Sequence, residues 1–247
     1  MQAILVRVGI DQGCGEWNAP ADLESGEFVY VPIPEGFKSQ FAEGTARSFA
    51  EIEPLLREFY SRRKLDFTSN SSFPTQLLER SMHLDPDFCH LTYGDDGAAR
   101  GSDIKKLNPG DLVVFYAGLR PLQKSKNRLV YSIIGLYVVD RIMKAVSVEA
   151  SSRHLNAHTR KLDICETDIV VHAIREFSGR LRRHIPIGEF RDGSYRVRLD
   201  LLDAWGGLSV TNGYIQRSGR PPRFNDAQKF YRWFNERGPE LIASNNA

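Results

Sequence analysis

The most continuous apolar stretches lie in the middle of the chain and predict two buried strands. The run LVVFYAGL follows a turn that ends at Pro109, Gly110 and Asp111, and its apolar character suits a strand buried in a small barrel. A polar basic loop, QKSKNR, leads to a second run, LVYSIIGL, which continues into YVVDRI across Gly135. A glycine inside such a pattern marks a bulge or a barrel corner.

Weaker patterns on the amino-terminal side predict two further strands and a helix. Residues 2–10 and 27–33 have the apolar content of strands, and PIPEG ends the second one. Residues 48–63 carry apolar side chains at helical spacing. Ser48 is placed as the N-cap of this helix, and Glu51 completes a capping box. Strands and helices are therefore mixed along the chain.

The domain organisation follows from length and from the absence of a linker. The 247 residues show neither an internal repeat nor a low-complexity segment, so we expect one α+β domain over residues 1–240. An amphipathic helix is predicted from Asn225, with aromatic side chains on one face. Residues 241–247 are expected to fray.

Composition indicates an ordinary globular protein without a membrane segment. The chain is 41% hydrophobic and 26% charged, and no apolar run approaches the roughly 18 residues that cross a bilayer. The first residues lack the features of a signal peptide, so we expect a cytoplasmic location. Cys14, Cys89 and Cys165 are odd in number and far apart, which fits reduced thiols rather than a disulfide framework.

The net charge of +2 conceals an acidic first half and a basic second half. Residues 1–100 contain 9 Lys/Arg against 16 Asp/Glu, whereas residues 171–237 contain 13 against 7, and all but one of those 13 are arginine. Arginine matches phosphate geometry well. The simpler alternative is a solvated face whose cations pair with acids from the other half of the chain. The candidate phosphate ligands are Arg7, Arg180, Arg182, Arg183, Arg217, Ser218 and Arg220.

Catalytic and cofactor motifs are missing from the sequence. It has no GxGxxG opening a helix, no Walker loop, no HExxH and no GxSxG. The run HLDPDFCH holds two histidines, two aspartates and a cysteine, but Pro86 and a spacing unlike known zinc patterns argue against a metal site. We expect an acid-rich loop with capping roles, no metal and no cofactor.

Two polar and aromatic stretches are candidates for the walls of a base-binding pocket. In the first, Trp17 offers a π-face and Asn18 a paired donor and acceptor; alternatively, they plug the core and cap the chain. In the second, TYGD, Gly94 would take positive φ and present Tyr93 and Asp95 on a tight turn, where they could stack on a base and accept its N–H groups. The alternative is a packed tyrosine and an Asx-turn aspartate.

Two resemblances connect these residues to nucleic acids. Residues 104–143 resemble the PUA-like barrels, including the EVE and ASCH groups, whose members bind RNA or modified bases. The resemblance lies in the order of a Leu, a Gly-Asp pair, a strand, a basic loop and a strand that contains Ile-Gly. Over most of the chain, the stretches RVGID, WNAP, FVYVPIPE, HLDPDF, TYGD and WGGLS resemble the third nucleotide modification-associated domain family. This resemblance implies a role with modified nucleotides in the DNA of phages and microbes, and it brings no active site to transfer.

Three functions remain open, and a reader of modified bases is preferred. This reader would have a PUA-like barrel core with flanking helices and the pocket described above. Its arginines would bind the phosphates of the partner, which is a nucleic acid or nucleotide, and modified DNA is the partner we favour. The first alternative is an enzyme that makes or alters a modified nucleotide, with Asp11 or Asp95 as general base. The second alternative is a protein-interaction module. A reader needs no titrating group deep in its pocket, whereas an enzyme needs one.

Overall fold

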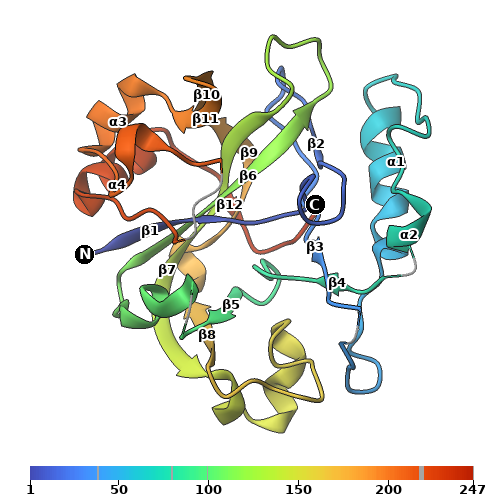
Figure 1. The fold of residues 1–247 in the computed structure, drawn as a ribbon. Coiled ribbons are helices and arrows are strands. Elements are labelled where there is room, and N and C mark those ends of the chain that lie inside the picture. Colours follow the sequence, from blue (N-terminus) through green and yellow to red (C-terminus); the bar gives the residue numbers. More distant parts are fainter. Residues whose placement is uncertain (38, 79, 99, 217–219, 247) are drawn as a thin grey trace.

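The computed structural model describes residues 1–37, 39–78, 80–98, 100–216 and 220–246 (Figure 1). Its strands are β1 (Ala3–Arg7), β2 (Pro20–Ala21), β3 (Ile33–Pro34), β4 (Met82–His83), β5 (Thr92–Asp96), β6 (Leu112–Pro121), β7 (Val130–Lys144), β8 (Asp168–Ala173), β9 (Gly179–Pro186), β10 (Gly188–Arg191), β11 (Ser194–Val197) and β12 (Leu241–Ile242). Its α-helices are α1 (Glu53–Ser61), α2 (Thr75–Leu78), α3 (Leu199–Trp205) and α4 (Ala227–Asn235). Short 3-10 turns are η1 (Phe49–Glu51), η2 (Arg100–Ser102), η3 (Ile104–Lys106), η4 (Ala145–Ser147), η5 (Ala150–Leu155), η6 (Arg175–Phe177) and η7 (Thr211–Gly213).

A large mixed sheet organises the fold. Its main path is β1, β6, β7, β8 and β5, with β2 beside β6 and with β9 and β12 beside β7. Both β1 and β2 run parallel to β6, whereas the other pairs in this sheet are antiparallel. Two small antiparallel pairs, β10 with β11 and β3 with β4, lie outside it. The predicted central hairpin is confirmed as β6 and β7, and the α+β class is consistent with this arrangement.

The PUA-like barrel expected over residues 104–143 is not confirmed, because no pairing closes the ladder among the described strands. The strand β7 changes partners along its length. Its first half pairs with β9 and its second half with β8, so the sheet divides into two branches instead of curling onto itself. The predicted bulge is present at Gly135, where a Cβ would lie 2.5 Å from the Phe88 ring.

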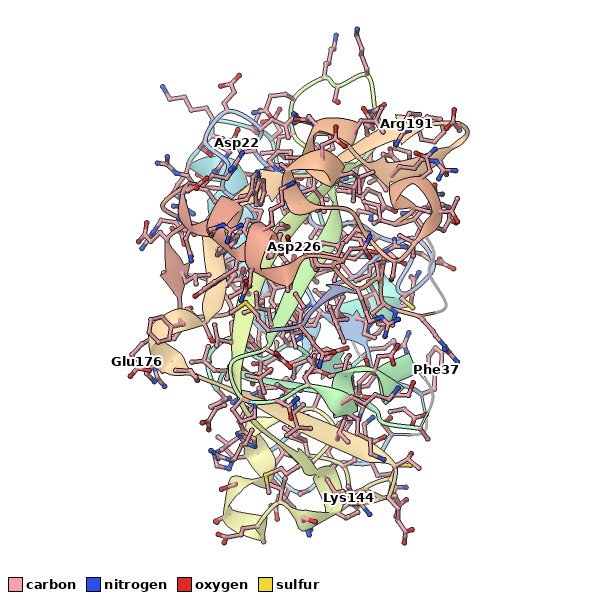
Figure 2. All side chains as sticks on the ribbon, turned by 90° about the vertical axis from the view of Figure 1, so that its left-hand side faces the viewer. Asp22, Phe37, Lys144, Glu176, Arg191 and Asp226 are labelled. Atoms are coloured by element: carbon pink, nitrogen blue, oxygen red, sulfur yellow. The ribbon has the colours of Figure 1, made fainter. Side chains whose placement is uncertain are left out.

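Both faces of the central strands are buried, which explains their continuous apolar sequence. Alternate residues of β6 enter two cores: Val113 and Phe115 belong to one, and Leu112 and Val114 to the other. Helices α1 and α2 cover the first core, and α3 and α4 cover the second, on opposite sides of the sheet in Figure 1. Figure 2 looks onto the side of α3 and α4, with Asp226, the N-cap of α4, in front.

The predicted helices form with the expected caps. Ser48 accepts the backbone N–H of Ala50 and Glu51 accepts that of Ser48, which confirms the capping box. The chain first makes the single turn η1 and then α1, with proline in the first turn where its missing N–H costs nothing. The predicted apolar face of the last helix is buried in α4: Phe230, Trp233 and Phe234.

Two local predictions differ from the structure. Residues 27–33 do not form a strand; their backbone makes isolated contacts, such as the N–H of Ile10 donating to the carbonyl of Val31, and only β3 begins at the end of this stretch. The tail beyond residue 240 does not fray. Strand β12 pairs with β9, and the Asn246 side chain accepts the N–H of Tyr30 and donates to its carbonyl. An amide side chain thus substitutes for a neighbouring strand.

Two expectations drawn from composition, on membrane segments and on cysteines, can be compared with the structure. No helix within the described ranges is long and apolar enough to cross a bilayer. All three cysteines are free, and each is exposed.

We predict that the buried His184 makes the fold sensitive to acid. Burial lowers the pKa of His184 to about 4, and its Nδ1 lies 2.9 Å from Ser132 Oγ. Between pH 6.5 and 4 the unfolded chain therefore binds a proton that the folded chain does not, so stability falls as pH falls. From pH 7.5 to 5 this one group should remove about 2 kcal/mol of unfolding free energy.

Urea unfolding at the two pH values measures this loss. His184→Asn keeps a polar side chain near Ser132 and should lose about 2 kcal/mol less than the unaltered chain. The exposed His154, changed to asparagine, is the matched control and should retain the full pH dependence. Equal losses in the His184 variant and the unaltered chain would disprove the assignment.

Candidate active site

Two chain segments, residues 83–90 and 154–161, meet side by side and contribute several buried polar side chains that contact one another. The first connects β4 to β5, and the second follows η5. Asn156 and His158 face Asp85, whereas Arg160 binds Asp87. The two carboxylates of the first segment therefore contact alternate residues of the second segment. Two polar clusters result, one around each aspartate.

The first cluster consists of one carboxylate and two imidazoles: Asp85, His83 and His158. The Asp85 side chain is 3% exposed, and the Gly94 N–H donates to both of its oxygens at 2.8 and 2.9 Å. The Nε2 atoms of His83 and His158 lie 3.7 and 3.6 Å from Asp85 Oδ2. The two rings meet edge to face, with centroids 4.9 Å apart. Among the described residues, these three can supply ligands that lie within 4.8 Å of one another, as a metal ion needs.

Two further carboxylates hold the outer nitrogens of both imidazoles. His83 Nδ1 lies 2.8 Å from Glu35 Oε1, and His158 Nδ1 lies 2.5 Å from Asp168 Oδ2. Glu35, just after β3, also pairs with Lys161 at 3.2 Å, and Asp168 is the first residue of β8. A carboxylate on Nδ1 accepts the N–H there, which fixes the ring and turns the Nε2 lone pair toward Asp85.

The charges of the cluster are coupled. Burial raises the pKa of Asp85 to about 6, although the charges of His158 and His83 act in the opposite direction. For His158, burial favours the neutral ring, but the hydrogen bond to Asp168 and the charge of Asp85 raise its pKa overall. Burial likewise opposes ionisation of Glu35, yet the hydrogen bond from His83 keeps the pKa of Glu35 below its ordinary value. The cluster therefore contains titrating groups that are shielded from bulk water.

Gly94 occupies a strand rather than the predicted tight turn. It lies inside β5, opposite Val170 of β8. The reason for glycine here is space, because a Cβ would overlap the His158 ring and lie 2.9 Å from Asn156 Oδ1. The close approach of that imidazole to the β5 backbone depends on the missing side chain.

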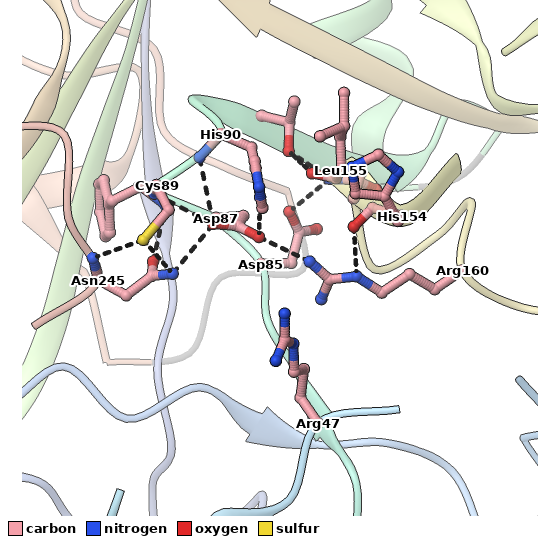
Figure 3. Close-up of polar contacts among 12 residues, drawn as sticks. Arg47, Asp85, Asp87, Cys89, His90, His154, Leu155, Arg160 and Asn245 are labelled. Carbon is pink, nitrogen blue, oxygen red and sulfur yellow. Dashed lines mark hydrogen bonds and ion pairs between the residues drawn. The ribbon is translucent and has the colours of Figure 1, made fainter. Parts of the chain in front are cut away.

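The second cluster surrounds Asp87, whose side chain has no exposed area. It binds Arg160 at 2.7 Å, His90 Nδ1 at 2.9 Å and the Asn245 amide at 3.0 Å (Figure 3). Burial opposes ionisation of Asp87, but these hydrogen bonds and charges lower its pKa. Its Oδ1 also accepts the backbone N–H of Cys89, as expected for a capping aspartate.

A cavity of about 280 Å³ adjoins this second cluster. Its walls combine apolar side chains of α1 and β4 with polar groups of the carboxy-terminal tail. Figure 3 shows Arg47 reaching toward Arg160 from the opposite side. Asp87 is engaged by Arg160, His90 and Asn245, and its cluster links the tail to the sheet.

The first predicted pocket wall lies in the core. Trp17 is buried against Phe73, with ring centroids 4.9 Å apart, and its indole N–H has no hydrogen-bond partner among the described residues. Asn18 is buried and donates to the carbonyl of Gly118. The contact of Trp17 matches the packing alternative, whereas Asn18 bonds to a distant strand, β6, instead of capping its own turn.

The second predicted wall lies next to the histidine cluster. Tyr93 is buried, and its hydroxyl donates to Asp95 Oδ2 at 2.6 Å. Asp95 is partly exposed, and its charge acts on Asp85. Asp11, the other proposed base, has different contacts. It accepts the N–H groups of Gly13 and Cys14 and pairs with Arg7 at 2.7 Å.

The predicted phosphate ligands that the structure describes differ in exposure and in pairing. Arg180 is buried under the tail, its Nε donates to the carbonyl of Ser244, and burial lowers its pKa to about 10. Arg182 pairs with Glu240 at 2.7 Å. Arg183 and Arg220 are exposed, whereas residues 217 and 218 lie outside the described ranges.

The site residues that the sequence did not indicate are His158, Glu35 and Asp168. Glu35 lies far from the other two in sequence, whereas His158 and Asp168 are ten residues apart, and none belongs to a catalytic or metal-binding motif. The density of HLDPDFCH was the one usable signal, and it contributes His83 and Asp85. The segment that it contacts, NAHTRK, lies about seventy residues further on. Sequence motifs defined by short spacings cannot connect residues that far apart.

We predict that Gly94→Ala displaces His158. Overpacking of this kind costs about 1 to 3 kcal/mol of unfolding free energy. It should also weaken the hydrogen bond between His158 Nδ1 and Asp168, which the ¹⁵N-imidazole NMR signals report. Gly36→Ala is a control in which the new Cβ would lie 3.4 Å from Ser39 Oγ, an ordinary contact. An unchanged His158 signal in Gly94→Ala would contradict the packing described above.

Comparison with known proteins gives one match. A family model described as nucleotide modification associated domain 3 matches residues 2–218, which include all members of both clusters except Asn245. Searches of curated proteins and of solved structures return no match. The match covers most of the chain, and the chain therefore belongs to the nucleotide modification associated domain 3 family.

Proposed function

We propose that this protein is an enzyme that alters a nucleotide, with Asp85, His83 and His158 as its reaction centre. The family association with nucleotide modification supports the substrate class. The observation that carries the choice of an enzyme over a reader is the convergence of two imidazoles on a buried carboxylate, with Nε2 to Oδ2 distances of 3.7 and 3.6 Å. A reader of bases needs stacking and hydrogen-bonding groups but has no use for such a cluster.

The support of each ring by a carboxylate favours a reactive role. Glu35 and Asp168 hold the outer nitrogens, so the inner nitrogens keep a fixed direction toward the centre. Preorganised groups of this kind stabilise charge in a transition state without reorganising at the moment of reaction. Asp95, next to the cluster and bound by Tyr93, is a further acid–base group for this reaction, as the sequence suggested for an enzyme.

An exposed aromatic ring beside the cluster supports a nucleotide as the substrate. Phe37 follows Glu35 by two residues and is 90% exposed at the edge of the molecule (Figure 2). The Arg80 guanidinium lies 4.0 Å from the centroid of that ring and also donates to the Glu35 carbonyl. A ring and a guanidinium together form a surface on which a flipped or single-stranded base stacks.

We predict that the enzyme changes the nucleoside composition of cells that produce it. DNA and RNA from these cells, digested to nucleosides, should show by mass spectrometry a nucleoside of altered mass. Asp85→Asn should abolish it, because the central carboxylate is lost while the hydrogen bond from Gly94 can remain. Asp140→Asn, at an aspartate whose side chain is 47% exposed and pairs with its neighbour Arg141, is the control and should keep it.

The same experiment separates the enzyme from the reader. If the nucleoside profile with the unaltered protein equals that with Asp85→Asn, while both bind the same oligonucleotides, the enzyme is excluded and the reader stands.

We further predict that Phe37 contributes to binding of single strands. Phe37→Ala should weaken the affinity for a single-stranded oligonucleotide by about 10- to 100-fold, which corresponds to one lost stacking contact. Phe190→Ala, which removes another exposed ring, should leave the affinity unchanged. Fluorescence anisotropy at two salt concentrations measures both variants, and equal effects of the two would refute the stacking role.

A further inference from the structure

We propose that His83 Nε2, His158 Nε2 and Asp85 Oδ2 bind one divalent transition-metal ion. The role of this ion in catalysis rests on the proposed function, whereas its binding rests on the geometry of the three side chains alone. The three come from β4, from the segment that leads to β5, and from the segment after η5. The side chains of His83 and His158 are 14% and 13% exposed, so a small ion can enter from solvent.

Three electron-rich atoms face one another in this cluster. In the neutral form of each ring, with Nδ1–H donated to a carboxylate, Nε2 carries a lone pair, and both Nε2 atoms lie near the same carboxylate oxygen. Distances of 3.7 and 3.6 Å exceed those of a hydrogen bond, so a proton on either Nε2 would not bridge to Asp85. A cation between the three atoms removes their mutual repulsion.

The separations agree with a single bound ion. Donor atoms each about 2.1 Å from one metal lie about 3.0 to 3.6 Å apart for angles of about 90 to 120°. The Nε2 to Oδ2 distance of His158, 3.6 Å, is at the upper end of this interval, that of His83, 3.7 Å, is slightly beyond it, and the three ligand atoms lie within 4.8 Å of one another. Small movements of the two rings would therefore complete the coordination.

The neighbouring carboxylates have the arrangement of outer-shell groups in metal sites. A histidine that binds a metal donates its other N–H to a carboxylate or carbonyl, which raises the basicity of the ligand nitrogen. Both histidines do so here, through Glu35 and Asp168. Asp85 has its own support from the Gly94 N–H and from the Asn156 amide at 3.3 Å. Each ligand is thus positioned by a second residue.

The donor set selects the class of ion. Two imidazoles and one carboxylate suit Zn²⁺, Fe²⁺, Mn²⁺ or Co²⁺, whereas Mg²⁺ and Ca²⁺ prefer oxygen ligands. Three protein ligands leave at least one position for water or substrate, as in catalytic rather than structural sites. The other acid and histidine cluster cannot compete, because Asp87 already binds the Arg160 guanidinium at 2.7 Å.

Titration of the purified full chain with Co²⁺ and Zn²⁺ tests the site. Visible absorption of Co²⁺ and calorimetry with Zn²⁺ should show about one ion per chain and no binding of Mg²⁺ at the same concentration. His83→Gln and His158→Gln should weaken binding by more than about 100-fold, and Asp168→Asn by about 10- to 100-fold. His90→Gln, on the same segment but beside Asp87, is the control and should bind as the unaltered chain does.

The unaltered chain provides a readout that does not depend on whether a variant folds. Zn²⁺, which is diamagnetic, should shift the NMR signals of the His83 and His158 rings more than those of His90 and His184. Absence of stoichiometric Co²⁺ or Zn²⁺ binding, or its loss in His90→Gln instead of His83→Gln, would overturn the proposal. No nucleic acid is present in these titrations, so this result is independent of whether Asp85 is needed for nucleotide alteration.

Discussion

Two carboxylates separated by one proline, Asp85 and Asp87, are almost fully withdrawn from water, and an ionised buried group is costly unless donors compensate it. Asp87 obtains Arg160, His90 and Asn245, whereas Asp85 obtains the Gly94 amide and faces two imidazoles. These needs bring strand β5, the segment at 154–161 and the carboxy-terminal tail to one place. The hydroxyls of Tyr30 and Tyr137 donate to the carbonyls of Pro86 and Asp87, so the backbone that carries the two carboxylates is also anchored.

The hydrophobic pattern of the sequence predicted those helices and strands whose formation depends mainly on residues close together in the chain. The hairpin of β6 and β7 was visible because both strands are apolar on both faces, and the start of the first helix was visible because its cap is local. Residues 27–33 were mistaken for a strand since they are buried and apolar but pair irregularly. The site depends on His158, whose contacts with Asp85 span seventy-three residues, and on Gly94, whose role is to leave room for a ring. Neither property has a local signature.

The arginine-rich second half illustrates why charge counts describe partners poorly. Several of its cations are neutralised by acids close in sequence, as in Arg191 with Glu189 and Arg198 with Asp200. Another, Arg180, is desolvated beneath the tail. An excess of positive charge along a sequence becomes a phosphate-binding surface only where the side chains stay unpaired and point outward. The acids that pair with Arg182, Arg191 and Arg198 belong to the same half of the chain, not to the acidic first half.

The carboxy-terminal tail packs on the domain but lies outside the family match. The region that the family model recognises is therefore shorter than the region that folds. The family match ends at residue 218, yet Asn245 completes the donors of Asp87, Asn246 satisfies the backbone of Tyr30, and β12 covers the edge of β9. A fragment cut at the end of the match would also lose α4, which closes the second core. Homology boundaries are therefore poor guides to autonomous fragments here, and the tail acts as a peptide ligand that the domain carries covalently attached to itself.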